Sequence, residues 1–225
     1  MPRFDIQIED LQKEEREKVA VLLTDAFESN PAYALIFTRK DKLWEGLLWL
    51  FKTNLFLINR RKVVTKVVKE KGSGEIIGVY SLLPPGGAKV KVIDYLQIGL
   101  PRFLMKFGFA TLRKMLGMDA YNKELLATAI GTDEYYYLSM VVVHEKYRGT
   151  GIGSYMIKNC LDELRSTAKK CRVLGLTTQL PENVTFYSHL GFQKLNEGEV
   201  QFKDQFYSSN GQFLILLIIE INFRP

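Results

Sequence analysis

The stretch at positions 136–158, YYLSMVVVHEKYRGTGIGSYMIK, constrains the fold of this chain more than any other. An apolar run that ends near Val143 indicates a strand, and a polar turn follows with glycines at 149, 151 and 153. Glycine has no Cβ, so the backbone can approach a ligand closely. A helix that begins there directs unpaired N–H groups and the positive end of its dipole toward the turn. The stretch therefore predicts a strand, an anion-binding turn and a helix.

The spacing of the glycines separates this turn from other phosphate loops. A nucleotide-triphosphate loop needs G-x-x-x-x-G-K-[ST], and a dinucleotide fingerprint needs G-x-G-x-x-G, and neither is present. The pattern R-G-x-G-x-G at 148–153 resembles the coenzyme A pyrophosphate loop of the GNAT superfamily of N-acyltransferases, [QR]-x-x-G-x-[GA]. A pyrophosphate is thus the expected ligand of the turn.

A second stretch resembles the segment that follows in the same superfamily. It contains an apolar strand at 174–178, a loop at 179–183, and FYSHLGF at 186–192. The two segments occur in the family's order with one helix between them, which is more specific than either alone. The resemblance covers about residues 134–195, which we expect to form the cofactor-binding core.

The resemblance implies transfer of an acetyl group from acetyl-CoA to a primary amine by direct attack on the thioester, without an acyl-enzyme. It implies that main-chain groups of three valines pair with the pantetheine arm, and that the glycine turn holds the pyrophosphate. The expected cofactor-binding residues are Val141, Val142, Val143, Arg148, Gly149, Thr150, Gly151, Ile152, Gly153, Ser154, Asn183 and Tyr187.

The resemblance also implies roles in catalysis. Tyr187 is the expected general acid, because a phenol with a pKa near 10 can protonate a departing thiolate. Asn183 is expected either to bond the pantetheine or to cap its helix. Many family members carry an asparagine where this chain has Leu180, and its neighbour Gln179 is a possible substitute.

The general base is less determined by the sequence. The predicted strand YYYLSMVVV contains no carboxylate, so Glu134 at its start is our candidate, beside Asp133. Ser139, a chain of waters, or the carboxyl end of another strand are alternatives. His144 follows the strand, in the turn toward the pyrophosphate, and is expected to contact the cofactor or the surface rather than act as base.

Composition places the chain among ordinary globular proteins. It has 225 residues, 47% of them hydrophobic, which predicts a single N-acetyltransferase domain over residues 1–225. The net charge of +6 suits an anionic ligand, and no nucleic-acid-binding motif is present. Two cysteines without CxxC spacing and two histidines argue against a metal site. We expect a cytoplasmic monomer or homodimer whose partners are acetyl-CoA and an unidentified amine, with no metal.

Hydrophobic periodicity predicts the remaining elements. Asp10 is the expected N-cap of a helix over 11–28 that Asn30-Pro31 ends. The other expected elements are a first strand at 4–8, a helix at 41–59, a hairpin of strands at 62–69 and 75–83, a helix at 151–169, a strand at 172–178, a short helix from Pro181 to Gly191, and strands at 192–195 and 212–223.

Residues 84–132 form an unusually long connection between the third and fourth expected strands. Helices are predicted at 100–117 and 121–130, and they either cover one sheet face, form a wall of the acceptor pocket, or lie on a membrane as a basic amphipathic segment. The expected fold is α/β, GNAT-like, with a mixed, twisted central sheet, helices on both faces and this helical insertion.

Two rival functions remain open at this point. One is a non-catalytic acyl-CoA-binding regulatory module on the same fold, which the missing strand carboxylate and Leu180 keep possible. The other is a peripheral membrane protein that uses residues 100–117. A transmembrane protein is not expected, because the longest apolar run, 213–219, is too short to span a bilayer.

Overall fold

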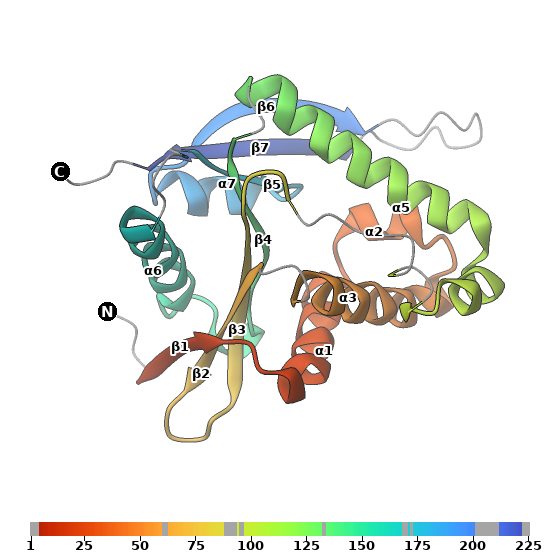
Figure 1. The fold of residues 1–225 in the computed structure, drawn as a ribbon, viewed down its shortest axis with the longest axis horizontal. Coiled ribbons are helices and arrows are strands. Elements are labelled where there is room, and N and C mark those ends of the chain that lie inside the picture. Colours follow the sequence, from red (N-terminus) through yellow and green to blue (C-terminus); the bar gives the residue numbers. More distant parts are fainter. Residues whose placement is uncertain are drawn as a thin grey trace.

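A seven-stranded mixed sheet runs through the molecule (Figure 1). The computed structural model describes residues 5–59, 63–87, 94, 97–131, 134–167, 171, 173–200 and 212–221. The strand order is β1-β2-β3-β4-β5-β7-β6, and only the β4–β5 pair is parallel. The strands are β1 (Ile6–Asp10), β2 (Val64–Glu70), β3 (Ile76–Leu83), β4 (Tyr136–Val143), β5 (Val173–Thr178), β6 (Gln193–Val200) and β7 (Gln212–Glu220).

Helices cover both faces of this sheet, as expected for the α/β class. One face packs against α1 (Arg16–Phe27), α2 (Pro31–Ile36), α3 (Leu43–Asn59) and α5 (Leu100–Ile130). The other face packs against α6 (Ile152–Thr167) and α7 (Pro181–Ser188) (Figure 1). Short 3₁₀ turns occur at Lys13–Glu15, Lys40–Lys42 and Glu145–Tyr147.

Side-chain alternation along the strands explains the two hydrophobic layers. Val67 and Val68 are adjacent on β2 and fully buried, yet Val67 packs with the α1–α3 layer and Val68 with the α6 layer. On β4, Met140 and Val142 face the first layer and Leu138 faces the second, because an extra residue in the strand between Ser139 and Val142 shifts the alternation by one. The sheet therefore has no solvated face in its centre, and access to its strands requires a local opening.

The first helix begins later than the sequence predicts. Asp10 is the last residue of β1 rather than an N-cap, because its carboxylate pairs with Lys66 on β2 at 3.0 Å. A capping box between Gln12 and Glu15 starts the 3₁₀ turn that leads into α1. Asn30 does not only end that helix, since its side chain accepts from Ala32 N at 3.0 Å and starts α2.

The insertion contains two helical segments, as the sequence predicts, but the break between them lies at a different residue. The helix α5 spans Leu100–Ile130, and its break lies at Gly108, with φ 82° and ψ 162°. Those dihedral angles belong almost only to glycine, so the chain turns there. Gly117, the expected end of the first helix, has helical dihedral angles and lies inside the second helical segment.

The C-terminal end of α5 packs closely on the sheet. A Cβ built on Gly175 of β5 would lie 3.3 Å from Leu126 and 3.5 Å from Ile130. The N-terminal part of α5 exposes Met105 and Phe109 instead, at 83% and 71% of their surface.

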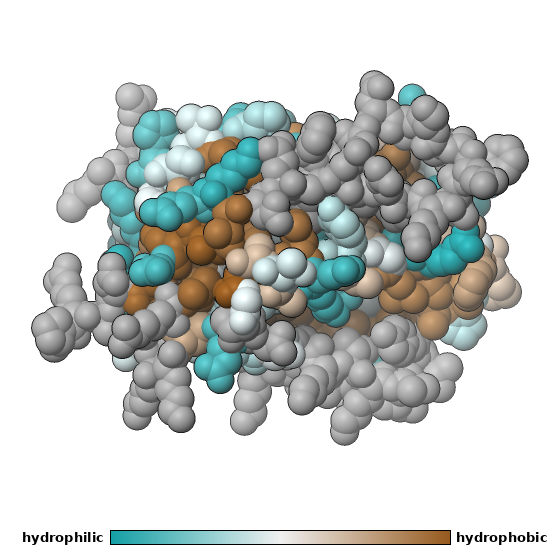
Figure 2. Space-filling view, turned by 90° about the horizontal axis from the view of Figure 1, so that it is seen from above, coloured by the Kyte–Doolittle hydropathy of each residue, from teal (hydrophilic) through white to brown (hydrophobic). Residues whose placement is uncertain are grey.

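Seen from above, hydrophobic side chains reach the surface in two areas divided by hydrophilic ones (Figure 2). Among the described helices, none combines the length and the apolar character that crossing a bilayer requires.

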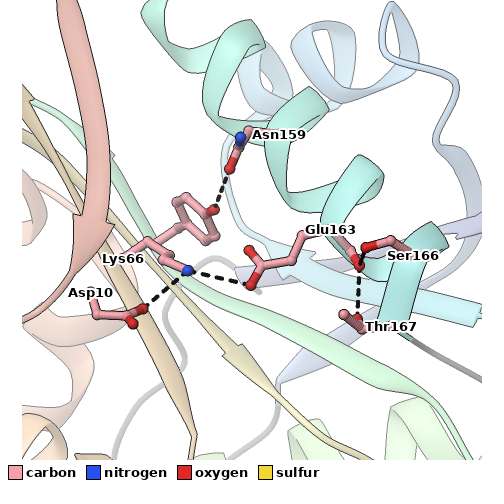
Figure 3. A network of polar contacts seen from close by, with 7 residues as sticks. Asp10, Lys66, Asn159, Glu163, Ser166 and Thr167 are labelled. Atoms are coloured by element: carbon pink, nitrogen blue, oxygen red, sulfur yellow. Dashed lines mark hydrogen bonds and ion pairs between the residues drawn. The ribbon is translucent and has the colours of Figure 1, made fainter.

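A polar network joins the edge of the sheet to α6 (Figure 3). Lys66 Nζ on β2 lies 3.0 Å from Asp10 Oδ1 and 3.3 Å from Glu163 Oε1 on α6. Nearby, Tyr80 on β3 donates its hydroxyl proton to Asn159 Oδ1 at 3.3 Å. These contacts fix α6, whose N-terminus carries the glycine turn, against the sheet.

Candidate functional site

The turn between β4 and α6 contains six successive N–H groups, those of residues 149–154, that have no acceptor among the described residues. The first main-chain bond of α6 runs from Tyr155 N to Gly151 O at 3.0 Å. Gly149 and Gly151 have φ of 73° and 88°, and a Cβ built on either would meet no atom within 4 Å. Free donors at a helix N-terminus, in front of open space, are the arrangement that binds an anion.

The side chains of the turn leave these donors accessible. Arg148 is exposed, and its Nε donates to Val143 O at 3.3 Å. Thr150 Oγ1 donates to Tyr147 O at 2.6 Å, and Ile152 is fully buried against the sheet. Gly153 is needed for packing, because a Cβ there would lie 3.2 Å from the Phe186 ring.

The strands β4 and β5 separate directly in front of this turn. They pair only at Tyr136 with Leu174 and at Tyr137 with Gly175. Beyond these pairs, the β5-facing main-chain groups of β4 have no partner in any described strand up to Val143. An extended amide-bearing chain could pair there as an added strand.

A bulge in β4 marks the same place. Val79 pairs with Val142 and Ser81 with Ser139, so β4 has one extra residue opposite β3. Met140 lies within this bulge and has φ 52°, which is strained for a residue with a side chain. Bulges of this kind are common next to active sites, where they redirect main-chain groups.

Tyrosine hydroxyls from both faces of the sheet meet at the opening. Tyr137 on β4 and Thr177 on β5 have hydroxyl oxygens 2.7 Å apart. Burial raises the pKa of Tyr187 on α7 above its usual range, and nearby Tyr137 raises it further. Burial and Tyr137 also raise the pKa of Tyr33 on α2. All three phenols are therefore protonated at neutral pH and can donate a hydrogen bond or a proton.

The short helix α7 holds Tyr187 in place. Its ring packs between those of Phe186 and Phe192, with centroids 5.0 and 5.4 Å away. Gly191, with φ 94°, ends the helix as the sequence predicts. No hydrogen bond from the Tyr187 hydroxyl to another described residue is formed.

Two amide side chains border the opening at the end of β5. Asn183 does not cap α7, whose N-cap is Leu180; it donates to Thr178 Oγ1 at 3.0 Å. Gln179 Oε1 accepts from Asn30 Nδ2 at 3.3 Å, which links β5 to the start of α2. Both residues line the central cavity and are positioned to contact a ligand.

A cavity of about 1320 Å³ connects all these features. It runs from the glycine turn along β4 residues 137–143 and past Tyr187 and Asn183. On the opposite face of the sheet it continues between α1, α2, α3 and α5. The lining residues thus form a continuous path from the turn to the insertion, whose helix both covers the sheet and forms a cavity wall.

The expected base is not brought to this cavity. Glu134 is exposed, its carbonyl accepts from Cys171 Sγ at 3.0 Å, and it is absent from the described residues that line the cavity. Asp133 lies outside the described residues. The His144 ring accepts from Lys146 N at 3.3 Å and does not line the cavity, and His189 is exposed on α7. Glu134 lies two residues before β4, at the end of the strand opposite the glycine turn, which explains why it does not line the cavity.

Sequence reasoning missed the residues that face the cavity from the other side. Tyr137 lies in a run of three tyrosines, and only the strand register shows which of them reaches the opening. Asp119, Asn122 and the rings of Phe27 and Tyr33 line the cavity from helices far apart in sequence. No local pattern could have indicated their proximity.

Comparison with known proteins agrees with this geometry. Residues 114–194 match the family model of the acetyltransferase (GNAT) domain. A comparison with curated protein sequences gives no match.

Solved structures share the fold over nearly the whole chain. A histone acetyltransferase HPA2 and related acetyltransferase from Corynebacterium glutamicum is 18% identical, with 96% of each chain covered and a TM-score of 0.63. An agmatine N-acetyltransferase is 12% identical, with 96% of this chain and 99% of that chain covered and a TM-score of 0.61. An N-acetyltransferase from Staphylococcus aureus is 14% identical, with 97% and 99% covered and a TM-score of 0.55.

Proposed function

We propose that this chain, whose residues 114–194 match the acetyltransferase (GNAT) domain model and whose fold is that of solved acetyltransferases, transfers an acetyl group from acetyl-CoA to the nitrogen of a primary amine. The observation that carries the proposal is the row of six N–H groups at residues 149–154 that have no acceptor in the described part of the chain, at the mouth of the gap between β4 and β5. Tyr187 and the glycine turn line one continuous cavity, which also supports it.

The chain's residues fit coenzyme A. The N–H groups of Gly149, Thr150, Gly151, Ile152, Gly153 and Ser154 would hold the pyrophosphate. Arg148 would add a charge-assisted contact, because its terminal nitrogens make no bond to described residues. The main chain of Val141–Val143 would pair with the pantetheine arm, and Asn183 would contact it from α7.

Acetyl-CoA supplies the acetyl group as a thioester. The protein would position the thioester and the amine, and would protonate the departing sulfur. A main-chain N–H beside the Met140 bulge would donate to the thioester carbonyl oxygen, which favours attack by the amine nitrogen on the carbonyl carbon. As the C–N bond forms and the C–S bond breaks, Tyr187 would give its proton to the sulfur. The ammonium loses two protons: one returns to Tyr187 and the other leaves to solvent.

The raised pKa of Tyr187 keeps the phenol protonated at neutral pH and also makes it a weaker acid than an ordinary phenol. Burial keeps the phenol protonated well above neutral pH, so the acid is loaded in each cycle. A thiolate with a pKa near 8.5 is a weaker base than the phenolate, but fixed proximity and later reprotonation from the nitrogen make the transfer productive.

The two free cysteines bear on location. Cys160 and Cys171 are both buried and unbridged. Free thiols are typical of reducing compartments, and we propose a cytoplasmic location on that basis.

Release of free coenzyme A in the presence of amines tests the proposal. The purified full chain is incubated with acetyl-CoA and a panel of primary amines, and thiol release is followed with a chromogenic disulfide. At least one amine should raise release at least tenfold over hydrolysis without amine. Tight acetyl-CoA binding with no release for any amine would favour a non-catalytic acyl-CoA-binding module instead.

A further inference from the structure

We infer that the acceptor is an amine on an apolar, ring-sized body, and that Asp119 on α5 binds its ammonium group. This inference rests on the proposed function and names the substrate class of the same cavity. It concerns the half of the cavity on the α1–α3 and α5 face, which the glycine turn and the pantetheine contacts leave unassigned.

Aromatic rings form one wall of this half. Phe27, Tyr33 and Phe51 pack as a triad, with ring centroids 5.8, 5.5 and 6.0 Å apart, and all three line the cavity. The aliphatic side chains of Leu112 and Met115 on α5 also line it. A wall of this kind gains free energy by burying an apolar body, and it offers little to a polyamine or an acidic substrate.

The cavity is large enough for both substrates. Its volume of about 1320 Å³ exceeds the roughly 300–1,000 Å³ of pockets that hold one drug-sized ligand. A pantetheine arm between β4 and β5 would fill only part of it. The remainder, between the aromatic triad and α5, has room for a ring.

Carboxylates are scarce in the cavity wall. Among the described lining residues only Asp119 and Glu182 are acidic, and Glu182 lies on α7, on the coenzyme side of the sheet. Asp119 lies on the acceptor side, near enough to the Tyr137 hydroxyl to raise the pKa of that phenol. Its Oδ2 accepts from Nζ of Lys123, which also lines the cavity, at 2.6 Å; both side chains are largely exposed, so a substrate ammonium can take the place of Lys123 at little cost. An ammonium could therefore bind Asp119 beside the tyrosine hydroxyls.

Asn122 adds a second acceptor on the same face of α5, three residues after Asp119. It lines the cavity, and its Oδ1 is buried without a hydrogen-bond partner among the described residues. A buried acceptor without a partner costs about 1–3 kcal/mol, which a ligand N–H can recover. Asp119 and Asn122 together present acceptors where an ammonium has donors.

A matched series of amines tests the substrate class. Ethylamine, butylamine, 2-phenylethylamine and spermidine are compared as acceptors with the full wild-type chain at saturating acetyl-CoA. The value of kcat/KM should rise along the first three and be at least tenfold higher for 2-phenylethylamine than for spermidine. A preference for spermidine would overturn the inference while leaving the proposed function intact, and no turnover with any amine would count against the proposed function itself.

The variant Asp119→Asn tests the ammonium contact. It should raise KM for 2-phenylethylamine about tenfold, with a smaller change in kcat and an unchanged Kd for acetyl-CoA. Asp162→Asn is the control, because it removes the carboxylate of a similar exposed pair, with Arg165 at 2.8 Å, on α6 away from the cavity. Equal KM values for wild type and Asp119→Asn would remove Asp119 from substrate binding.

The variant Phe27→Leu tests the aromatic wall and keeps an apolar side chain at this half-buried position. It should lower kcat/KM for 2-phenylethylamine at least about fivefold. The kcat/KM for ethylamine should stay within about twofold of the wild-type value. Met115→Ala, on the opposite wall, provides an independent measurement if Phe27→Leu folds poorly. An equal loss for both amines in both variants would contradict a ring-binding wall.

Discussion

The hydroxyl oxygens of Tyr137 on β4 and Thr177 on β5 lie 2.7 Å apart, across the gap where the main chains of the two strands no longer pair. A side-chain bond thus holds the strands at a fixed separation after their main-chain ladder ends at Tyr137 and Gly175. The gap leaves main-chain donors of β4 free and connects the two faces of the sheet. Its edges carry the groups that the proposed reaction requires.

Removal of the Tyr187 hydroxyl tests the general acid. Tyr187→Phe should lower kcat about 10²- to 10⁴-fold at saturating acetyl-CoA, because the thiolate then leaves without a proton donor. The Kd for acetyl-CoA should change less than threefold, since the ring and its packing with Phe186 and Phe192 are kept. Steady-state kinetics and calorimetry measure both.

Tyr80→Phe is the matched control for Tyr187→Phe. It removes another buried phenol, which bonds Asn159 on α6, and neither residue is among the described ones that line the cavity. Its kcat should stay within about twofold of wild type. A Tyr187→Phe enzyme with wild-type turnover would show that another group protonates the sulfur.

A side chain at Gly151 should weaken coenzyme binding. Its φ of 88° costs an alanine about 1–2 kcal/mol of strain, and the new methyl group would enter the open space where the pyrophosphate is expected. Gly151→Ala should therefore raise the Kd for coenzyme A at least tenfold, by calorimetry. Gly74→Ala carries similar strain, with φ 69° in the β2–β3 hairpin and equally open surroundings, and it should leave this Kd unchanged.

The thiol of Cys160 should make stability depend on pH in the alkaline range. Burial, and then the charge of Glu163, raise its pKa to about 12, whereas an unfolded thiol has a pKa of about 8.5. Above pH 8.5 the unfolded state loses this proton and the folded state keeps it. The free energy of unfolding should thus fall by up to about 1.4 kcal/mol per pH unit between pH 8.5 and 10.

Urea unfolding of wild type and Cys160→Ala at pH 7.5, 9 and 10 measures this dependence. The slope of the unfolding free energy against pH should be smaller for the variant by the contribution of about one proton. Its stability at pH 7.5 should be lower than that of wild type, because removing the thiol leaves a cavity. The buried tyrosines with raised pKa, such as Tyr80, ionise in the unfolded state only near pH 10. They therefore contribute little to the difference in slope between the two proteins. Parallel slopes for the two proteins would contradict the assignment to Cys160.

The ion pairs of Lys66 should contribute to stability through their partial burial. The side chain of Lys66 is only 18% exposed, between Asp10 and Glu163. A double-mutant cycle of Lys66→Met and Glu163→Gln should give a coupling energy of about 0.5–1 kcal/mol in urea unfolding. The exposed pair Asp162–Arg165 should give a coupling near zero, and equal couplings would refute a role for burial.

The parts of the molecule that depend on local pattern could be predicted from the sequence. The turn at 148–153 and the helix that Gly191 ends lie where their glycines and apolar spacing place them. The start of α1 could not, because a contact with Lys66, distant in sequence, keeps Asp10 in β1. The break between the helices predicted at 100–117 and 121–130 lies at Gly108 instead, since Gly108 and Gly117 look alike in sequence and local pattern does not distinguish them.

The candidate site divides in the same way. The proposed coenzyme half lies on one continuous segment with a motif, so its residues can be predicted from the sequence. The acceptor half joins α1, α2, α3 and α5, so Asp119 and the Phe27–Tyr33–Phe51 triad emerge only when the helices pack. Glu134 precedes β4 by two residues in sequence, but it is not among the described residues that line the cavity.

Amide hydrogen exchange with and without saturating acetyl-CoA tests the central proposal most directly. The account predicts slowed exchange at the amides of residues 149–154 and along β4 up to Val143, because these N–H groups gain acceptors. Unchanged exchange at residues 149–154, with acetyl-CoA present far above its Kd, would contradict the account.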